Sequence, residues 1–561
     1  MLSLSAVLIA LPASYGLILL AWHILRHLLL VKHIGTQNLR LLQATRSRHD
    51  KIPGTAVVCG GGIAGLLTAR VCHAHFKRVL LVEAEAWLST EDARRVDGWK
   101  HLRTPRARLM QWNSLHSSQA FLFAGLENLF PNIEQECERS KIKVLPARPR
   151  FSISGAIWRP PPKNGLYKTM YTARHSLETF IRSALSRLLV HIDAWHDRRL
   201  VLDHDAYPDI EFAAGTVIDV LPDEADPSRL GKAVIRLDTG MVQEVPAALI
   251  ADCTGPARAG AKWLARHRYG GALDSLKLCF DQKLRYSSMS FTASPEFMDR
   301  LEAVLPPDMR GDGPIITFME DLTEESKVNG RGYFIIWRKD GNQIMTFAGH
   351  TGEVRFQPSN VEGLREYMRS MYQAVPIPDW LWRVLDLLEE IEDTALVSLL
   401  KVPATSYLQY YKARNLPSNF VALGDSVMTI NPIFGEGCTK ALRCAMALHT
   451  ELLRAQRHPG GSLPPTFAQE FFAEERDKTE WLWDNTRVLD YGVPTTEPIP
   501  GESLSSGAGL RWYITWLQRL APYDDHAGRV MYDTVTGFSS PIDALHPNLV
   551  AKVLWRGLVT G

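Results

Sequence analysis

Apolar positions follow three patterns along the chain. From Ser5 to Trp22 no side chain is charged, and the apolar character continues to Val31, which is long enough for a helix that crosses a bilayer. Over 176–190, apolar residues recur at helical spacing and predict an amphipathic helix. Between 277 and 349, short apolar runs, some of them alternating with polar residues, are separated by Gly, Asp and Asn, which predicts a largely antiparallel sheet.

Other apolar runs have the length and flanks of buried strands. One leads into Gly60, a second ends at Glu83, and two more cover 248–252 and 420–424, the last followed by a helix over 438–455. The C-terminal hundred residues are expected to be mostly helical. Strands that alternate with helices on both sides of an antiparallel segment predict a mixed α/β (α+β) fold. It would combine a discontinuous Rossmann-like domain with an antiparallel-sheet domain.

This organisation predicts the division of the chain. We expect a transmembrane signal anchor at 1–32, a basic linker at 33–53, the nucleotide-binding domain in two parts at 54–258 and 401–460, an antiparallel-sheet substrate domain at 259–400, and a helical region at 461–561.

The strand that ends at Cys59 opens a glycine motif. Gly60, Gly62 and Gly65 have the G-x-G-x-x-G spacing, a helix-compatible segment follows, and the next strand ends in Glu83, 23 residues after Gly60. Gly60 permits a tight turn, Gly62 lets a pyrophosphate approach the backbone, and Gly65 lets the helix pack on the sheet. Glu83 is placed to accept hydrogen bonds from a ribose diol. The motif predicts a dinucleotide site without saying which dinucleotide.

A second loop, between 424 and 437, selects among dinucleotides. Asp425 ends a buried strand and can accept a hydrogen bond from a sugar-alcohol hydroxyl, while Pro432 after Asn431 fixes a bend. Gly435 and Gly437 let backbone approach a flat ring at the start of the next helix. Because a reduced flavin is negatively charged, a helix N-terminus stabilises it by about 0.3–2 kcal/mol. The two loops together predict an FAD site.

Composition and charge narrow the class of protein. The chain has 561 residues and a net charge of +2, so we expect no nucleic-acid partner. Its seven cysteines are scattered without metal-ligand or disulfide spacing, and we expect them to be structural and no metal to be bound.

Charge also orients the N-terminal helix. Lys and Arg follow the apolar run and none precedes it, which places the rest of the chain in the cytosol behind a single-pass anchor, with the endoplasmic reticulum membrane as the expected location. The alternative is a cleaved signal peptide, with Leu11-Pro12-Ala13-Ser14 as a cleavage region.

The pairing of GGGIAG…VEAE with GDSVMTINPIFGEGCTKA resembles the FAD-dependent monooxygenases of the aromatic-hydroxylase and squalene-epoxidase type. The resemblance extends over most of the chain after residue 54 and includes Asp252-Cys253-Thr254-Gly255-Pro256. It implies that Gln111 lies in a segment shared with a microbial branch, and that Arg174 is a flavin-contacting arginine. It also implies that NADPH reduces the flavin, that dioxygen adds at C4a, and that the resulting hydroperoxide transfers one oxygen to an apolar substrate.

Within that family, the membrane-anchored form is similar to fungal enzymes that epoxidise or hydroxylate polyene or polyketide intermediates of secondary metabolism. The chain departs from the phenol hydroxylases around 252–258, and it lacks the WxWxIP signature of flavin halogenases. The mechanism needs no catalytic side chain. We expect His116 to be a satisfied turn histidine, although it could act as an acid, and Glu436 to be a helix-start carboxylate rather than a base.

Two other functions stay open. The stretch 252–255 also resembles prenyl reductases, which suggests a flavin-dependent reductase or dehydrogenase acting on an isoprenoid or polyketide. The chain could also be a membrane-tethered flavoprotein without catalytic activity.

Overall fold

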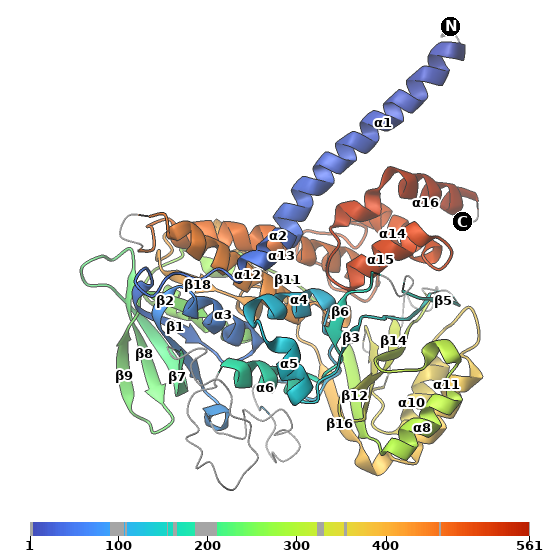
Figure 1. Cartoon of the computed structure of the whole chain (residues 1–561), viewed down its shortest axis with the longest axis horizontal. Coiled ribbons are helices and arrows are strands. Elements are labelled where there is room, and N and C mark those ends of the chain that lie inside the picture. The colour runs from blue at the N-terminus through green and yellow to red at the C-terminus, as the bar shows by residue number, and fades with distance from the viewer. Residues whose placement is uncertain are drawn as a thin grey trace.

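A computed structural model describes residues 4–89, 106, 109–153, 155–160, 165–185, 210–321, 330–352, 356–458 and 462–559. It contains two seven-stranded sheets with helices around them (Figure 1). The mixed α/β fold expected from the sequence is therefore confirmed.

The first sheet combines a parallel half with an antiparallel one. Its strands are, in spatial order, β18 (Phe420–Ala422), β10 (Leu249–Asp252), β1 (Ile52–Cys59), β2 (Phe76–Glu83), β7 (Ile210–Pro222), β8 (Leu230–Leu237) and β9 (Val242–Pro246). β18, β10, β1, β2 and β7 run parallel, so their carboxyl ends meet at one edge, while β7, β8 and β9 form an antiparallel meander.

Helices cover this sheet because their apolar residues face it. α3 (Ile63–His73) packs on β1 and β2, α12 (Gly437–Ala455) packs on α3, and α13 (Phe467–Asp490) packs on α12. α12 belongs to a chain segment almost four hundred residues from β1, so segments far apart in the chain build this half of the molecule.

The second sheet is mostly antiparallel, as the alternation over 277–349 predicts. Its strands are, in order, β16 (Leu396–Lys401), β12 (Arg285–Thr292), β15 (Gln343–His350), β14 (Gly332–Lys339), β13 (Pro314–Met319), β4 (Phe151–Ile153) and β5 (Ala156–Trp158). One face packs on α8 (Pro295–Val304), α10 (Val361–Ser370) and α11 (Asp379–Glu389) through a core that includes Met289, Phe334 and Ile344. The other face contacts Leu115 and Ile433, which lie in loops outside this sheet.

Smaller elements connect the two sheets. The pairs β3 (Val144–Pro146) with β6 (Lys168–Met170) and β11 (Lys277–Phe280) with β17 (Thr405–Leu408) are short antiparallel ladders. The connecting helices are α4 (Ala120–Leu129), α5 (Ile133–Arg139), α6 (Arg174–Leu185) and α7 (Ala259–Arg266). α6 confirms the amphipathic helix expected over 176–190, whose last residues, 186–190, lie outside the described residues.

The chain ends in three helices, α14 (Ala508–Leu520), α15 (Asp525–Val535) and α16 (Pro547–Val559). With η13 (Pro541–Leu545) they form a separate apolar core that includes Trp158 of β5, Tyr532 and Val553. The C-terminal region is helical, as expected, and it lies beside the second sheet and the first helix of the chain (Figure 1).

The first helix, α1 (Leu4–Leu29), projects from the body of the molecule (Figure 1). Together with η1 (Leu30–Ile34) it is long and apolar enough to cross a membrane, a property that a signal sequence shares. The stretch after it is packed rather than extended, because Ile34, Leu39 of α2 (Thr36–Leu41) and Leu42 are buried. Arg443 of α12 donates to the Ile34 carbonyl at 2.9 Å. The domain boundaries named above stay predictions.

Candidate functional site

The carboxyl ends of β1, β10 and β18 meet above the glycine motif, and steric contacts explain why glycine stands there. Gly60 turns with φ +111°, and a Cβ on it would lie 2.4 Å from the Cys253 carbonyl oxygen. A Cβ on Gly65 would lie 1.7 Å from the Gly60 carbonyl oxygen. These two glycines therefore allow the first turn of α3 to approach the strand ends.

Gly62 and Gly437 differ from these two because open space lies beside them. A Cβ on either would meet no described atom within 4 Å, and each glycine begins a helix, α3 for Gly62 and α12 for Gly437. Within the described residues, the N-cap residue Glu436 makes no side-chain hydrogen bond to α12. Among the described residues, no side chain lies within 4 Å of a Cβ placed at either glycine, and a helix N-terminus with such space suits an anionic ligand.

The two predicted loops are in direct contact. A Cβ on Gly424, which has φ +67°, would lie 2.8 Å from the Ala64 Cβ inside the glycine motif. Ser426 Oγ accepts from the Gly255 amide at 2.9 Å and donates to the buried Asp252 at 3.2 Å. The loop after β18 thus contacts the loops after β1 and β10. The residues predicted in the two loops lie along one edge of the first sheet.

Glu83 lies at this edge but already has partners. Its Oε2 accepts from the Gly61 amide at 2.7 Å, and its Oε1 accepts from the Glu85 amide at 3.1 Å. Arg106 donates to Glu83 at 3.0 Å and also pairs with Glu85 and Glu178. Glu83 therefore orients the glycine loop, and the sequence reasoning missed Arg106, because its segment shows no pattern of its own.

Arg174 belongs to a buried charge cluster on α6. Glu178 is fully buried, and Arg174 at 2.6 Å, Arg182 at 2.7 Å and Arg106 surround it. Burial alone would raise the pKa of Glu178, but these three guanidinium groups lower it below its usual range. Arg182 also donates to the Gly61 carbonyl at 3.1 Å. Through Arg182 the cluster is thus tied to the glycine loop.

Asp425 points outward from the edge. Its side chain is 47% exposed, and Lys440, buried at the start of α12, donates to it at 2.6 Å. Lys440 also donates to the Met428 carbonyl. A carboxylate held by a buried lysine yet open on its other side is placed to accept hydrogen bonds from a polyol chain.

The loop from Asn431 to Gly437 has a buried support. Asn431 caps the short helix η11 (Pro432–Phe434), accepting from the Ile433 amide at 3.0 Å, and donates to Asp490 at 2.8 Å. Burial raises the pKa of Asp490 to about 7. The side chain of Asn431 is therefore used inside the protein, which leaves the loop backbone to face a ligand.

The same loop touches the segment that carries Gln111 and His116. Gly435 has φ +67°, and a Cβ on it would lie 2.8 Å from the Ser117 Cβ. Gln111 lies within hydrogen-bonding reach of Tyr286 on β12, and Ser114 accepts from the Tyr286 hydroxyl at 3.2 Å. The 109–119 segment thus lies between the glycine-rich edge and the second sheet.

The surroundings of His116 and Glu436 shift the pKa values of both side chains. His116 Nδ1 lies 2.9 Å from the Ser114 carbonyl, and burial and the positive charge of Arg174 lower the pKa of His116 to about 3. Burial raises the pKa of Glu436 to about 7, against the opposing charges of Arg443 and Lys440.

The face of the second sheet that meets this segment is apolar and aromatic. Tyr286, Ile335, Trp337 and Phe347 form one cluster, with Leu115 of the 109–119 segment and Ile433 of the Asn431 loop packed against it. Tyr286 and Phe347 lie with ring centroids 4.7 Å apart. No single sequence position identifies this face, because it depends on which side of each strand is turned inward.

Lys339 closes the end of that face. It is buried, donates to the His116 carbonyl at 2.7 Å, and lies 4.6 Å from the centroid of the Trp337 ring. Burial lowers the pKa of Lys339 to about 7. Its hydrogen bond ties β14 to the 109–119 segment.

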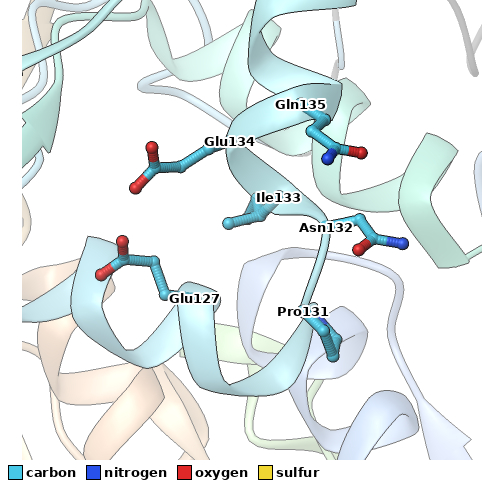
Figure 2. Close-up of a pocket in the computed structure, with 6 residues that line it drawn as sticks. All are labelled: Glu127, Pro131, Asn132, Ile133, Glu134 and Gln135. Atoms are coloured by element: carbon cyan, nitrogen blue, oxygen red, sulfur yellow. The ribbon is translucent and has the colours of Figure 1, made fainter.

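A hollow of about 300 Å³ lies elsewhere, between α4 and α5 (Figure 2). Glu127 and Glu134 project on one side of it, whereas Asn132 and Gln135 point the other way. Burial and a hydrogen bond that Glu127 donates to Glu134 raise the pKa of Glu127 to about 7. None of the residues at the glycine-rich edge lines this hollow.

The fold has relatives among proteins of known structure, although no protein-family model matches the chain. The flavin-dependent brominase Bmp2 superimposes with a TM-score of 0.52 at 12% identity, covering 90% of this chain and 100% of its own. PqsL, a probable FAD-dependent monooxygenase from Pseudomonas aeruginosa, gives a TM-score of 0.52 at 14% identity and covers 82% and 100%. The chain shares its fold with these flavoenzymes.

A curated protein also matches over most of its length. Protein Rv3254 of Mycobacterium tuberculosis is 21% identical over 448 residues, which cover 79% of this chain and 82% of that protein. At these identities the likeness establishes the architecture, and what the edge binds has to be argued from its own residues.

Proposed function

We propose that the glycine-rich edge binds FAD and that the protein is an FAD-dependent monooxygenase. The observation that carries this proposal is the pair of open helix N-termini at Gly62 and Gly437, joined through the Gly424–Ala64 contact. One extended anionic ligand with a flat ring at one end fits that arrangement.

Different residues of the site would contact different parts of such a ligand. Gly60, Gly62 and Gly65 with Glu83 would hold the ADP half, and Arg174 and Asp425 the pyrophosphate and ribityl region. The backbone from Asn431 through Pro432 and Gly435 to Gly437 would lie under the ring, with Gln111 on the side of the second sheet. The residues fit, because Gly62 and Gly437 leave space and Asp425 is half exposed.

When bound and reduced by NADPH, FAD would supply the means to activate dioxygen for transfer of one oxygen atom. This chain's own residues then have to place a substrate and exclude water. The cluster formed by Tyr286, Ile335, Trp337 and Phe347 supports an apolar substrate next to Ile433 of the ring loop.

The substrate that we propose is an apolar natural-product intermediate, a polyene or polyketide of fungal secondary metabolism, which is epoxidised or hydroxylated. The resemblance of the two loops to the epoxidase-type family supports this, as does the aromatic face. α1 supports a single-pass membrane anchor with the catalytic body on the cytosolic side, in the endoplasmic reticulum, where an apolar substrate partitions.

Aerobic turnover by the purified full chain tests the activity. With FAD, NADPH and candidate polyenes, we expect oxygen uptake that depends on substrate and a product heavier by one oxygen atom, labelled when ¹⁸O₂ is supplied. Substrate reduction without oxygen uptake would instead establish the reductase or dehydrogenase alternative. Bound FAD with no turnover of any candidate substrate would favour the tethered, non-catalytic flavoprotein.

A further inference from the structure

The C-terminal helices expose an apolar surface. α16 buries Leu549, Val553 and Gly557 on one side, where a Cβ on Gly557 would lie 2.4 Å from the Trp512 ring of α14. On its other side Trp555 is 73% exposed and Leu558 is 78% exposed. Other exposed apolar side chains of α14, α16 and their connections are Leu510, Trp512, Tyr523, Leu545, Leu554 and Val559.

η13 and α16 lie beside α1 (Figure 1). Trp22 donates from Nε1 to the Ile542 carbonyl at 3.0 Å, and its ring meets His546 edge-on with centroids 4.6 Å apart. Arg26 pairs with Asp543, and the Tyr15 hydroxyl donates to Asn548 at the start of α16.

These contacts extend far along α1. Tyr15 and Arg26 are separated by about 16 Å of helix at 1.5 Å per residue. The contacted stretch is the same part of α1 that exposes Leu17, Ile18, Leu20, Ile24 and Leu25. Wherever this stretch enters an apolar medium, η13 and the start of α16 enter beside it.

The chemistry of the surface suits a bilayer interface. Basic side chains lie among the exposed Trp and Tyr side chains. Arg556 lies 5.1 Å from the Tyr523 ring centroid, and Lys552 pairs with Asp524. A helix that is apolar on both sides, with long basic side chains that can reach the headgroups, is typical of an element that lies in the membrane interface.

We propose that α16, with the exposed side of α14, is a second membrane-contacting element that lies in the interface of the bilayer in which α1 inserts. This inference rests on the proposed anchoring by α1 and is independent of the flavin chemistry. A protein partner that covered α16 would also have to cover the exposed side chains of α1 beside it, whereas a lipid bilayer covers both at once.

A second contact has a structural consequence. α1 alone would leave the body free to rotate about the anchor. Trp158 of β5 is buried in the core formed by α14, α15 and α16, so contact between α16 and the bilayer would hold the β4–β5 edge of the second sheet toward the membrane.

Fluorophore labelling of the full chain tests this proposal. Leu558→Cys, carrying an environment-sensitive NBD label, is reconstituted into phosphatidylcholine–phosphatidylglycerol vesicles and exposed to doxyl-labelled lipids and to aqueous iodide. Leu399→Cys on β16 is the matched control, because Leu399 is an exposed apolar residue at 51% on the edge of the second sheet opposite β5. Ile18→Cys, at 55% exposure, reports insertion of α1, and the unmutated chain gives the background from native cysteines.

We expect the label at Leu558 to emit at shorter wavelength than that at Leu399. Doxyl lipids should quench it several-fold more strongly, and iodide several-fold less. The proposal is overturned if Leu558 behaves like Leu399 while Ile18 is quenched by lipid, or if neither Leu558 nor Ile18 is quenched. Shielding of Leu558 that is the same without lipid and that rises with protein concentration would instead indicate a second copy of this chain on α16, and would also overturn it.

Discussion

The two sheets meet at the candidate site in different ways. The first sheet presents strand ends and glycines, so its surface there is backbone, with Gly62 and Gly437 open and Gly65 closed by a carbonyl. The second presents a face of side chains, Tyr286 and Phe347 among them. The backbone of the first sheet can bind any ligand of the right shape and charge. The side chains of the second sheet determine which other molecule can fit beside that ligand. Under the proposed function, cofactor binding and substrate choice would therefore fall to separate sheets.

The largest effect is expected at Gly65, where Gly65→Ala tests the backbone side. Its Cβ would lie 1.7 Å from the Gly60 carbonyl oxygen, so we expect loss of the folded protein, seen as lost cooperative unfolding by circular dichroism. Gly62→Ala is the matched control, because its Cβ meets no described atom within 4 Å and the variant should fold. Equal melting temperatures for the two variants would contradict this account of the motif.

Glu178→Gln tests the charge cluster behind the glycine loop. Removing the carboxylate leaves the surrounding arginines buried without their counter-charge, which should cost about 3–5 kcal/mol of unfolding free energy in urea denaturation. Glu211→Gln breaks the exposed pair with Arg78 and should cost about 1 kcal/mol or less. Similar losses of unfolding free energy in both variants would show that the buried ion pairs of Glu178 contribute no more than the exposed Glu211–Arg78 pair.

Phe347→Leu tests the side-chain side. The swap should cost about 1 kcal/mol of unfolding free energy and leave FAD content unchanged. Product formed per NADPH consumed should fall several-fold, because the smaller side chain would no longer exclude water from the site. Phe334→Leu alters the opposite face of the same sheet, which packs on the outer helices, and should lose similar stability without that loss of coupling. Equal coupling in both variants would remove the second sheet from the site.

A further prediction concerns pH and the support of the loop from Asn431 to Gly437. Since burial raises the pKa of Asp490 to about 7, the folded state holds a proton that the unfolded state releases above its lower, ordinary pKa. Unfolding free energy should therefore fall as pH rises between these values, by at most about 1.4 kcal/mol per pH unit from this group.

Asp490→Asn should remove that contribution while its amide oxygen still accepts from Asn431. Relative to the unmutated chain, the variant should gain stability between about pH 5 and pH 7 in urea unfolding, since other titrating groups are common to both chains. A stability difference that is the same at both pH values would show that Asp490 titrates normally.

The sequence was informative where backbone geometry restricts the residue type. Gly60 and Gly65 are predictable because any side chain would collide. Asp425 was expected at the end of a buried strand, but β18 ends at Ala422 and Asp425 lies in the short helix after it. Alternation over 277–349 likewise predicted the antiparallel sheet, since strand residues alternate between its faces.

What the sequence did not predict depends on side chains that meet across long separations. Arg106 reaches Glu83, Asp490 supports Asn431, and the C-terminal helices pack on α1, and none of these pairs leaves a periodic signal. The linker expected at 33–53 shows the same limit, because its basic composition concealed Ile34 and Leu39 packed in the core. The membrane anchor and the roles of individual site residues stay predictions.

The central claim is that one FAD spans the two open helix N-termini. Titration of the flavin-free full chain with FAD tests it directly, comparing the unmutated chain with Gly62→Leu and Gly437→Leu, which place a side chain at either end. We expect one FAD per unmutated chain, and affinity lowered by about tenfold or more in each variant, equal to about 1.4 kcal/mol, with melting temperatures unchanged. Unmutated protein that binds no FAD, or a variant that binds it as tightly, would contradict the account.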